Sequence, residues 1–313
     1  MIVRDRPSGL KLFLSLRGSV LPRILPALIL NTVIATLVTL THGDLFNIKI
    51  TLTTIPFSMI GLPLAIFLGF RNNAAYDRYW EARKLWGELV LRSRNLARQC
   101  QSLIQHPVPA TAALGLDDVR VRMVYRAIAF SYALKDLLRN TAPSPEISTL
   151  LTKTEWEQTA KSTNIPHLLM LSMGRDVRLC LDEGRLDPCL ANSIDATLSA
   201  MGGAAASCER IRGTPIPFSY TLLLHRTAYL YCFLLPFGLV DTIGFMTPFV
   251  VAIVAYTFFG LDALGDEIEE PFGSEINDLA LEAICRGVEI NLRESLADDY
   301  VPAPLEAVNY CLT

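Results

Sequence analysis

The chain has 313 residues, of which 51% are hydrophobic and 19% are charged, and its mean hydropathy is +0.34. This composition is too apolar for an ordinary soluble protein of this size and indicates a membrane protein with a large soluble part. The formal net charge of −3 excludes the basic excess that is typical of nucleic-acid-binding proteins. Seven widely spaced cysteines without a C-x-x-C pair argue against a disulfide framework, and we expect them to be small buried apolar residues.

The N-terminal 23 residues carry an excess of Arg and Lys around an amphipathic piece, Leu10 to Leu16. Positive charge beside a first span predicts a cytoplasmic N-terminus. An uncharged stretch over about 24–41 is long enough to cross a bilayer with some tilt.

A second uncharged stretch runs from Ile55 to Phe70 and is followed at once by a dense mixture of charged, amide and aromatic residues. Helical spacing continues through both parts, which predicts one helix that passes from lipid into water. Within the apolar part, Leu62, Ile66 and Phe70 recur at i, i+4 and i+8, so they form one line along one helix face.

This line has two interpretations. It can be a lipid-facing or core stripe, or it can be the wall of a pore if several copies of the helix surround an axis. In the second case, stacked rings of bulky apolar side chains form a constriction that gates by dewetting.

Polar and aromatic residues follow the line directly. The polar ones could coordinate permeating ions, but structural ion pairs, such as Asp77 or Glu81 with an Arg, are favoured because a charge near a bilayer normally has a partner. They are Arg71, Asn72, Asn73, Asp77, Arg78 and Arg83.

The aromatic residues after the line suggest an interfacial belt and packing between subunits. They are Tyr76, Tyr79, Trp80 and Trp86.

The soluble part is predicted to be helical, since periodic apolar segments are separated by Pro-rich and Gly-rich turns and no alternating strand pattern is found. The expected helices cover about 74–104, 117–139, 146–161, 165–183, 188–212 and 275–297. Two further spans are expected at about 220–240 and 243–261, with a short turn around Asp241, so both termini would face the cytoplasm.

An acidic run extends from Asp266 to Asp278, and no Lys or Arg occurs between Arg226 and Arg286. Bunched carboxylates can bind a hard divalent cation, although the EF-hand spacing is missing. The alternative is a solvated acidic surface or helix cap. The candidate metal ligands are Asp266, Glu269, Glu270, Glu275 and Asp278.

No catalytic motif is present. The four histidines have no partners at metal-ligand spacing, and neither a nucleophile elbow nor a phosphate-binding loop occurs. The sequence therefore predicts no enzyme and no catalytic residues.

The motifs IPFSMIGLPLAIFLGFRNNAAYDRYWEARKLWG, TPIPFSYTLLLHR and EEPFG occur in this order, and with them the chain resembles the bacterial branch of the bestrophin family from about Leu10 to about Asn291. Bestrophins are pentameric ion channels, so the resemblance implies a pore whose hydrophobic neck is formed by Leu62, Ile66 and Phe70. It also implies a second, cytoplasmic narrowing. The best match there is GRLDPCLAN, with Cys189 as the candidate ring residue and a buried structural cysteine as the alternative.

In animal bestrophins the segment after the fourth span forms a calcium clasp. Here the Pro271 to Gly273 turn matches, but the acidic residues after it are sparse. We expect no required cofactor, with a divalent cation possible at the acidic run.

The expected architecture is an all-α membrane protein with four transmembrane helices and a helical cytoplasmic domain, assembled as a pentameric ring around one axial pore in the inner membrane. The expected parts are residues 1–70 with two spans, 71–219 as the cytoplasmic helical domain, 220–262 with two spans, and 263–313 with the acidic cluster and a C-terminal helix. Its partners would be further copies of itself, monovalent ions and the lipid bilayer, without nucleic acid.

The expected function is passive conduction of small monovalent ions. The scarcity of Lys and Arg beside the acidic run favours cations such as sodium. The resemblance implies the same for the bacterial branch, whereas animal bestrophins pass anions, so a chloride or other anion channel is the alternative. Two other classes stay open: a non-conducting membrane scaffold, and a transporter or metal-dependent membrane enzyme that uses the acidic cluster.

Overall fold

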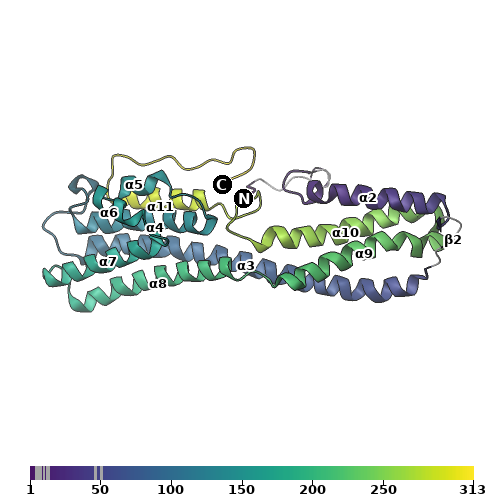
Figure 1. The fold of residues 1–313 in the computed structure, drawn as a ribbon. Coiled ribbons are helices and arrows are strands. Elements are labelled where there is room, and N and C mark those ends of the chain that lie inside the picture. Colours follow the sequence, from purple (N-terminus) through teal and green to yellow (C-terminus); the bar gives the residue numbers. More distant parts are fainter. Residues whose placement is uncertain (4–8, 10, 12–14, 46–47, 50–51) are drawn as a thin grey trace. The chain divides into compact units, whose positions relative to one another are not determined.

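The fold is described from a computed structural model, which covers residues 1–3, 9, 11, 15–45, 48–49 and 52–313 (Figure 1). Its contacts divide the chain into two compact units. The apolar unit comprises Arg4–Tyr79 and Pro215–Glu270, and the polar unit comprises Met1–Val3, Trp80–Thr214 and Pro271–Thr313. The amphipathic piece predicted at Leu10 to Leu16 lies mostly outside the described residues.

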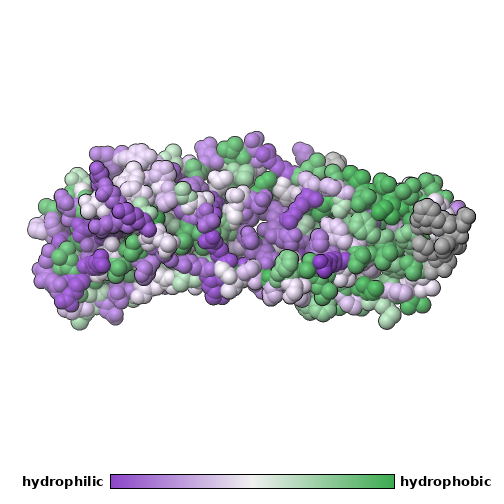
Figure 2. All heavy atoms as spheres, viewed as in Figure 1, coloured by the Kyte–Doolittle hydropathy of each residue, from purple (hydrophilic) through white to green (hydrophobic). Residues whose placement is uncertain are grey.

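The apolar unit is a bundle of long helices. Three described helical stretches are long and apolar enough to cross a membrane: Leu21–Leu40, Thr54–Leu103 and Phe218–Glu269. The third stretch contains two helices, α9 and α10, so it agrees with two predicted spans. Figure 2 shows hydrophobic side chains over the helices of this unit and mostly hydrophilic ones over the polar unit. The elements are α2 (Leu21–Leu40), the N-terminal part of α3 (Thr54–Leu103), α9 (Phe218–Ile243), η2 (Gly244–Met246) and α10 (Thr247–Glu269).

Two connections differ from expectation. The turn between the last two spans lies at η2, where Gly244 has a positive φ of 55°, and not around Asp241, which is still helical. The linker between α2 and α3 contains a short antiparallel pair, β1 (Asp44–Leu45) and β2 (Ile48–Lys49).

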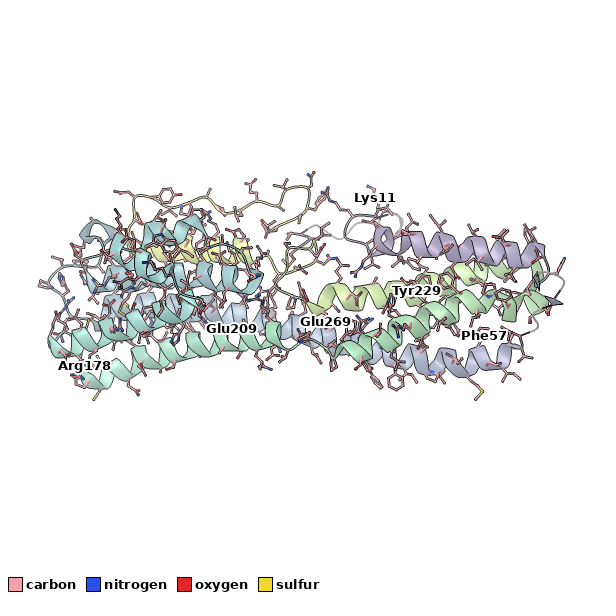
Figure 3. The ribbon with its side chains drawn as sticks, viewed as in Figure 1. Lys11, Phe57, Arg178, Glu209, Tyr229 and Glu269 are labelled. Atoms are coloured by element: carbon pink, nitrogen blue, oxygen red, sulfur yellow. The ribbon has the colours of Figure 1, made fainter. Side chains whose placement is uncertain are left out.

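Helices α3 and α9 approach closely because glycines lie at their contacts. A Cβ atom on Gly61 would lie 2.9 Å from the Tyr231 hydroxyl, and one on Gly238 would lie 2.3 Å from the Phe57 ring. Phe57, labelled in Figure 3, also makes an edge-to-face contact with Tyr231 at 5.9 Å. Small residues at helix contacts are typical of membrane bundles, in which packing replaces the hydrophobic effect as the main attraction.

The polar unit is helical, as predicted, and α4 is its most buried helix, with most of its side chains enclosed. Its elements are the C-terminal part of α3, η1 (Ala112–Leu114), α4 (Val119–Arg139), α5 (Pro145–Leu150), α6 (Lys153–Thr159), α7 (Ile165–Asp182), α8 (Pro188–Gly213) and α11 (Leu281–Ser295).

Local sequence explains where these helices begin. Asp118, Asn164 and Asp187 each cap a helix by accepting a backbone N–H two or three residues later, and Pro166 and Pro188 occupy first-turn positions that need no donor. The helix predicted over 146–161 is broken in two, since Leu151 is extended and the Thr152 hydroxyl caps α6 by accepting the Glu155 N–H at 3.3 Å.

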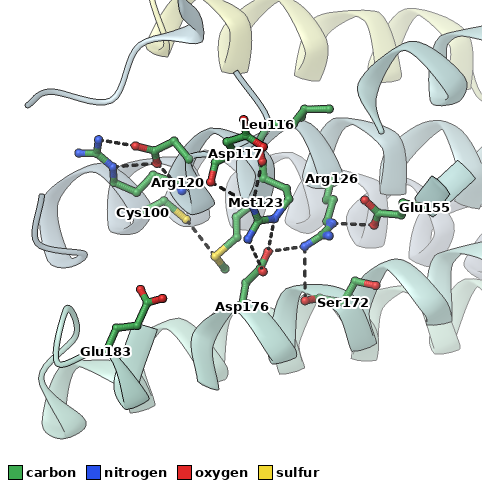
Figure 4. A network of polar contacts seen from close by, with 12 residues as sticks. Cys100, Leu116, Asp117, Arg120, Met123, Arg126, Glu155, Ser172, Asp176 and Glu183 are labelled. Carbon is green, nitrogen blue, oxygen red and sulfur yellow. Dashed lines mark hydrogen bonds and ion pairs between the residues drawn. The ribbon is translucent and has the colours of Figure 1, made fainter. Parts of the chain in front are cut away.

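Buried ion pairs join α4 to α6 and α7 inside the polar unit (Figure 4). The Arg122 guanidinium donates two hydrogen bonds to the Asp176 carboxylate, at 2.8 and 3.2 Å, and Arg126 donates to Glu155 at 2.7 Å and also pairs with Asp176. Two-point arginine pairs fix the geometry of neighbouring helices as well as their charge.

The cysteines follow the prediction only in part. Five of them are buried and free, namely Cys100, Cys180, Cys208, Cys232 and Cys285. Cys189 is exposed and Cys311 is partly buried. For Cys189 the interpretation as a buried structural cysteine is therefore wrong.

Candidate functional site

The apolar line on α3 lies on the side of the helix that faces away from its own bundle. Leu62, Ile66 and Phe70 are 67%, 46% and 60% exposed, whereas Leu64 and Leu68 are buried against α9. At about 100° per residue, Leu62 and Ile66 point roughly opposite to Leu64. This exposure excludes a core stripe within one chain and leaves a lipid-facing stripe or a pore wall.

Directly after this line, Arg71 turns to the opposite side of α3 and is completely buried. Its guanidinium donates to the Asp262 carboxylate at 2.8 Å and to the Asp262 carbonyl oxygen at 3.3 Å, and it also pairs with Asp266. A Glu269 carboxylate oxygen lies 3.8 Å away. We call Arg71, Asp262, Asp266 and Glu269 the arginine hub.

Three further groups contact the carboxylates of the arginine hub. His225 Nδ1 lies 2.6 Å from the second Asp262 carboxylate oxygen, Arg23 donates to Asp266 at 3.0 Å, and the Ile216 N–H donates to Glu269 at 3.0 Å. Figure 3 labels Glu269 at the end of α10. The carboxylates of the hub therefore have partners on α2, α3 and α9.

A glycine makes room for the hub. A Cβ atom on Gly265 would lie 2.5 Å from the Asn72 side-chain oxygen and 3.4 Å from the Arg71 guanidinium carbon. Asn72 uses this room to donate to the Leu261 carbonyl oxygen at 3.1 Å. Because Gly265 has no side chain, the polar face of α3 can contact the backbone of α10.

The sequence predicted structural ion pairs below the line, and the hub agrees with that prediction for Arg71. Glu81 also has a partner, since Arg210 donates to it at 2.7 Å. Among the aromatic residues, Tyr76 and Trp80 are exposed, but Trp86 is completely buried in the polar unit. The assignment of Trp86 to an interfacial belt is therefore wrong, because α3 has entered the polar core at that point.

The predicted metal ligands do not form one cluster in the described part of the chain. Asp266 and Glu269 belong to the arginine hub, while Asp278 accepts the Glu275 N–H at 2.6 Å in the following turn. Within the described residues, no three His, Cys, Asp or Glu side chains are placed to hold a metal ion. A divalent-cation clasp with Glu270 as a further ligand stays a prediction.

The candidate ring residue Cys189 lies in the first turn of α8. Its N–H donates to the Asp187 carboxylate at 2.7 Å, which caps the helix, and its thiol is exposed in the single chain. Exposure is required of a residue that lines an aperture, and the role itself stays a prediction.

Sequence reasoning did not assign Asp262, His225 and Arg23 to a site. The sequence did contain a signal for these three residues. Each lies near the end of an apolar span, and a charge in that position normally has a partner. The pairing itself could not be read, because Arg71 and Asp262 are 191 residues apart in the chain.

Comparisons with known proteins show similarity to one family over most of the chain. Residues 1–294 match the Bacterial/Fungal Bestrophin protein family. The chain is 45% identical over 302 residues to a voltage-dependent anion channel-forming protein of Mesorhizobium japonicum, covering 95% of this chain and 93% of that one. It is 40% identical over 307 residues to a voltage-dependent anion channel-forming protein of Escherichia coli K12, covering 97% of each.

A crystal structure of a bacterial bestrophin homologue from Klebsiella pneumoniae has a TM-score of 0.81 and 36% identity, covering 88% of this chain and 100% of that one. The shared helical arrangement therefore extends over most of the chain.

Proposed function

The chain belongs to the bacterial and fungal bestrophin family, and from this membership we propose that it forms a passive channel for small monovalent anions. The family is one of channel-forming proteins, and the chain is not an enzyme. The observation that carries the proposal is the exposed line of Leu62, Ile66 and Phe70 on the helix side opposite the arginine hub.

The proposed assembly is a ring of copies, five by likeness to the family, because four spans of one chain cannot enclose a pore. In the ring, α3 of each copy faces the axis. We also propose multi-pass insertion in the inner membrane. The charge excess before α2 favours a cytoplasmic N-terminus, and four spans would return the C-terminus to the same side.

The proposed gate is the neck formed by Leu62, Ile66 and Phe70 of all copies. A narrow apolar constriction expels water, which raises the barrier to any ion, and it conducts when it widens enough to become wet. Such a neck holds no fixed charge, so it cannot select between anions and cations. We propose that selectivity is set at another part of the pore, and the ring of Cys189 side chains is one candidate.

The sequence alone favoured sodium, and the relatives change that preference. Relatives that cover nearly the whole chain are named anion channel-forming proteins. Part of the acidic run that suggested cations is also compensated, since Asp266 and Glu269 lie beside Arg71, and Asp266 also pairs with Arg23. We therefore propose anion conduction, with cation conduction as the competing result of the test below.

The test is ion flux through purified protein in liposomes, measured in separate sodium and chloride gradients. The triple variant Leu62→Ala, Ile66→Ala, Phe70→Ala should conduct more than the parent protein because its neck is wider. The matched control is Leu30→Ala, Val33→Ala, Leu37→Ala on α2, which removes three apolar side chains that are 54%, 49% and 56% exposed. It should leave flux unchanged.

A reversal potential that follows the chloride gradient supports the anion channel, and one that follows sodium overturns its selectivity. Equal and measurable flux in the parent and neck variants would show that the line faces lipid. No flux in any form would favour the non-conducting scaffold.

A further inference from the structure

A pocket of about 520 Å³ lies in the polar unit, between the start of α5 and α11. Its volume is within the range of small-molecule sites. Its lining combines two arginines, two glutamates and an apolar edge. The lining residues are Pro145, Glu146, Thr149, Arg286, Glu289, Arg293 and Tyr300.

Arg286 is a poorly satisfied charge in this lining. Its side chain is only 18% exposed, and its Nε is buried without an acceptor among the described residues. Its terminal nitrogens reach carboxylate oxygens of Glu146 at 3.7 Å and of Glu289 at 3.9 Å, which are both longer than a hydrogen bond. A buried guanidinium with spare donors favours an added oxyanion.

Two neighbouring charges are already satisfied. Glu289 accepts hydrogen bonds from the Tyr132 hydroxyl at 2.7 Å and from Arg293 Nε at 2.9 Å. Arg293 also donates to Asp298 at 2.7 Å, and its guanidinium lies over the Tyr300 ring at 5.1 Å. This stacking keeps Tyr300 at the edge of the pocket.

Glu146 remains as the complementary charge. Its side chain is one-third exposed, and within the described chain its carboxylate has only the long contact to Arg286. The pocket thus offers one weakly bonded cation and one weakly bonded anion. A simple anion would be repelled by Glu146, and a simple cation by Arg286.

We propose that this pocket binds a free α-amino acid. Its carboxylate takes the spare donors of Arg286, its ammonium group takes the carboxylate of Glu146, and its side chain packs against Pro145 and Tyr300. In an α-amino acid both charges flank a single carbon atom, which suits two protein groups that lie 3.7 Å apart.

The test is isothermal titration of the purified full-length protein with L-leucine, with sodium acetate and methylammonium chloride as probes that carry one charge each. L-leucine should bind saturably and the single-charge probes should not. Arg286→Gln and Glu146→Gln should each weaken binding at least tenfold. The matched control is Arg178→Gln on α7, where the Arg178 side chain is 75% exposed and pairs with Asp182; it should bind as the parent does.

Binding of acetate as tight as that of L-leucine would overturn the proposal in favour of a simple anion site. Absence of saturable L-leucine binding by the parent protein would also overturn it. Melting curves of the variants identify any that fail to fold. Arg286→Lys keeps the positive charge and should retain part of the affinity for L-leucine. The titration measures ligand binding and not ion flux, so its result is independent of whether the protein conducts ions.

Discussion

Nη1 of Arg71 lies 2.8 Å from Oδ1 of Asp262, and the two side chains are 0% and 5% exposed. This contact joins α3, immediately after Phe70, to α10. The residue that ends the apolar line is thus followed by the residue that fixes the helix to its own bundle.

Arg71→Met should destabilise the protein by about 3–5 kcal/mol, since it leaves the buried Asp262 carboxylate without its cation. Thermal unfolding in detergent measures this loss. The control is Glu81→Gln, which removes a pair whose side chains are 45% and 59% exposed and should cost about 0–1 kcal/mol. Equal effects of the two substitutions would contradict a structural role for the hub.

Gly238→Ala should cost about 1–3 kcal/mol, because its new Cβ would meet the Phe57 ring, which is itself held by Tyr231. Gly69→Ala is the matched control in α3, where a Cβ meets nothing within 4 Å. That change should stabilise the helix by about 0.5–1 kcal/mol. Unfolding midpoints of both variants test this prediction. An unchanged midpoint for Gly238→Ala would show that α3 and α9 can move apart to accept the new methyl group without loss of stability.

Asn31→Val should stabilise the apolar unit by about 1–3 kcal/mol. Asn31 on α2 is completely buried, and neither its amide nitrogen nor its oxygen has a partner among the described residues. Replacing an unsatisfied polar group by an apolar one removes its desolvation cost. A lower melting temperature would instead reveal a polar partner for this amide, such as water.

Asp298 should make the polar unit sensitive to acid. Burial alone would raise its pKa, but hydrogen bonds from the Tyr125 hydroxyl, the Tyr300 N–H and Arg293 outweigh burial and hold the pKa below the usual value. The stability that this carboxylate provides is therefore present above about pH 4 and is lost as the pH falls through the lowered pKa.

Melting temperatures at pH 7, 5, 4 and 3 test this prediction. Asp298→Asn should melt lower than the parent at pH 7, and its melting temperature should fall less between pH 4 and pH 3. A parallel fall in both proteins would show that other carboxylates control acid unfolding.

The helices were predictable because their signals are local. An uninterrupted apolar stretch such as Ile55 to Phe70 has few alternatives to a span, and helical spacing continues through the rest of α3. The break between α5 and α6 was also local: Thr152 and Glu155 have the spacing of a capping box, but the apolar periodicity on either side concealed it.

The site was predictable only in part. Helical spacing gave the line of Leu62, Ile66 and Phe70, but spacing cannot tell which side of a helix meets its own bundle. The partners of Arg71 and the burial of Trp86 depend on contacts between distant segments, which a single sequence does not display.

The arginine hub has a consequence for the order of biosynthesis. In the proposed topology Arg71 follows the second span on the cytoplasmic side, and a positive charge there orients a helix during insertion. Asp262 is made 191 residues later, so Arg71 is still unneutralised when α3 enters the membrane. In that topology the same guanidinium acts first as a topogenic signal for one span and afterwards as the counter-charge for the Asp262 carboxylate on another.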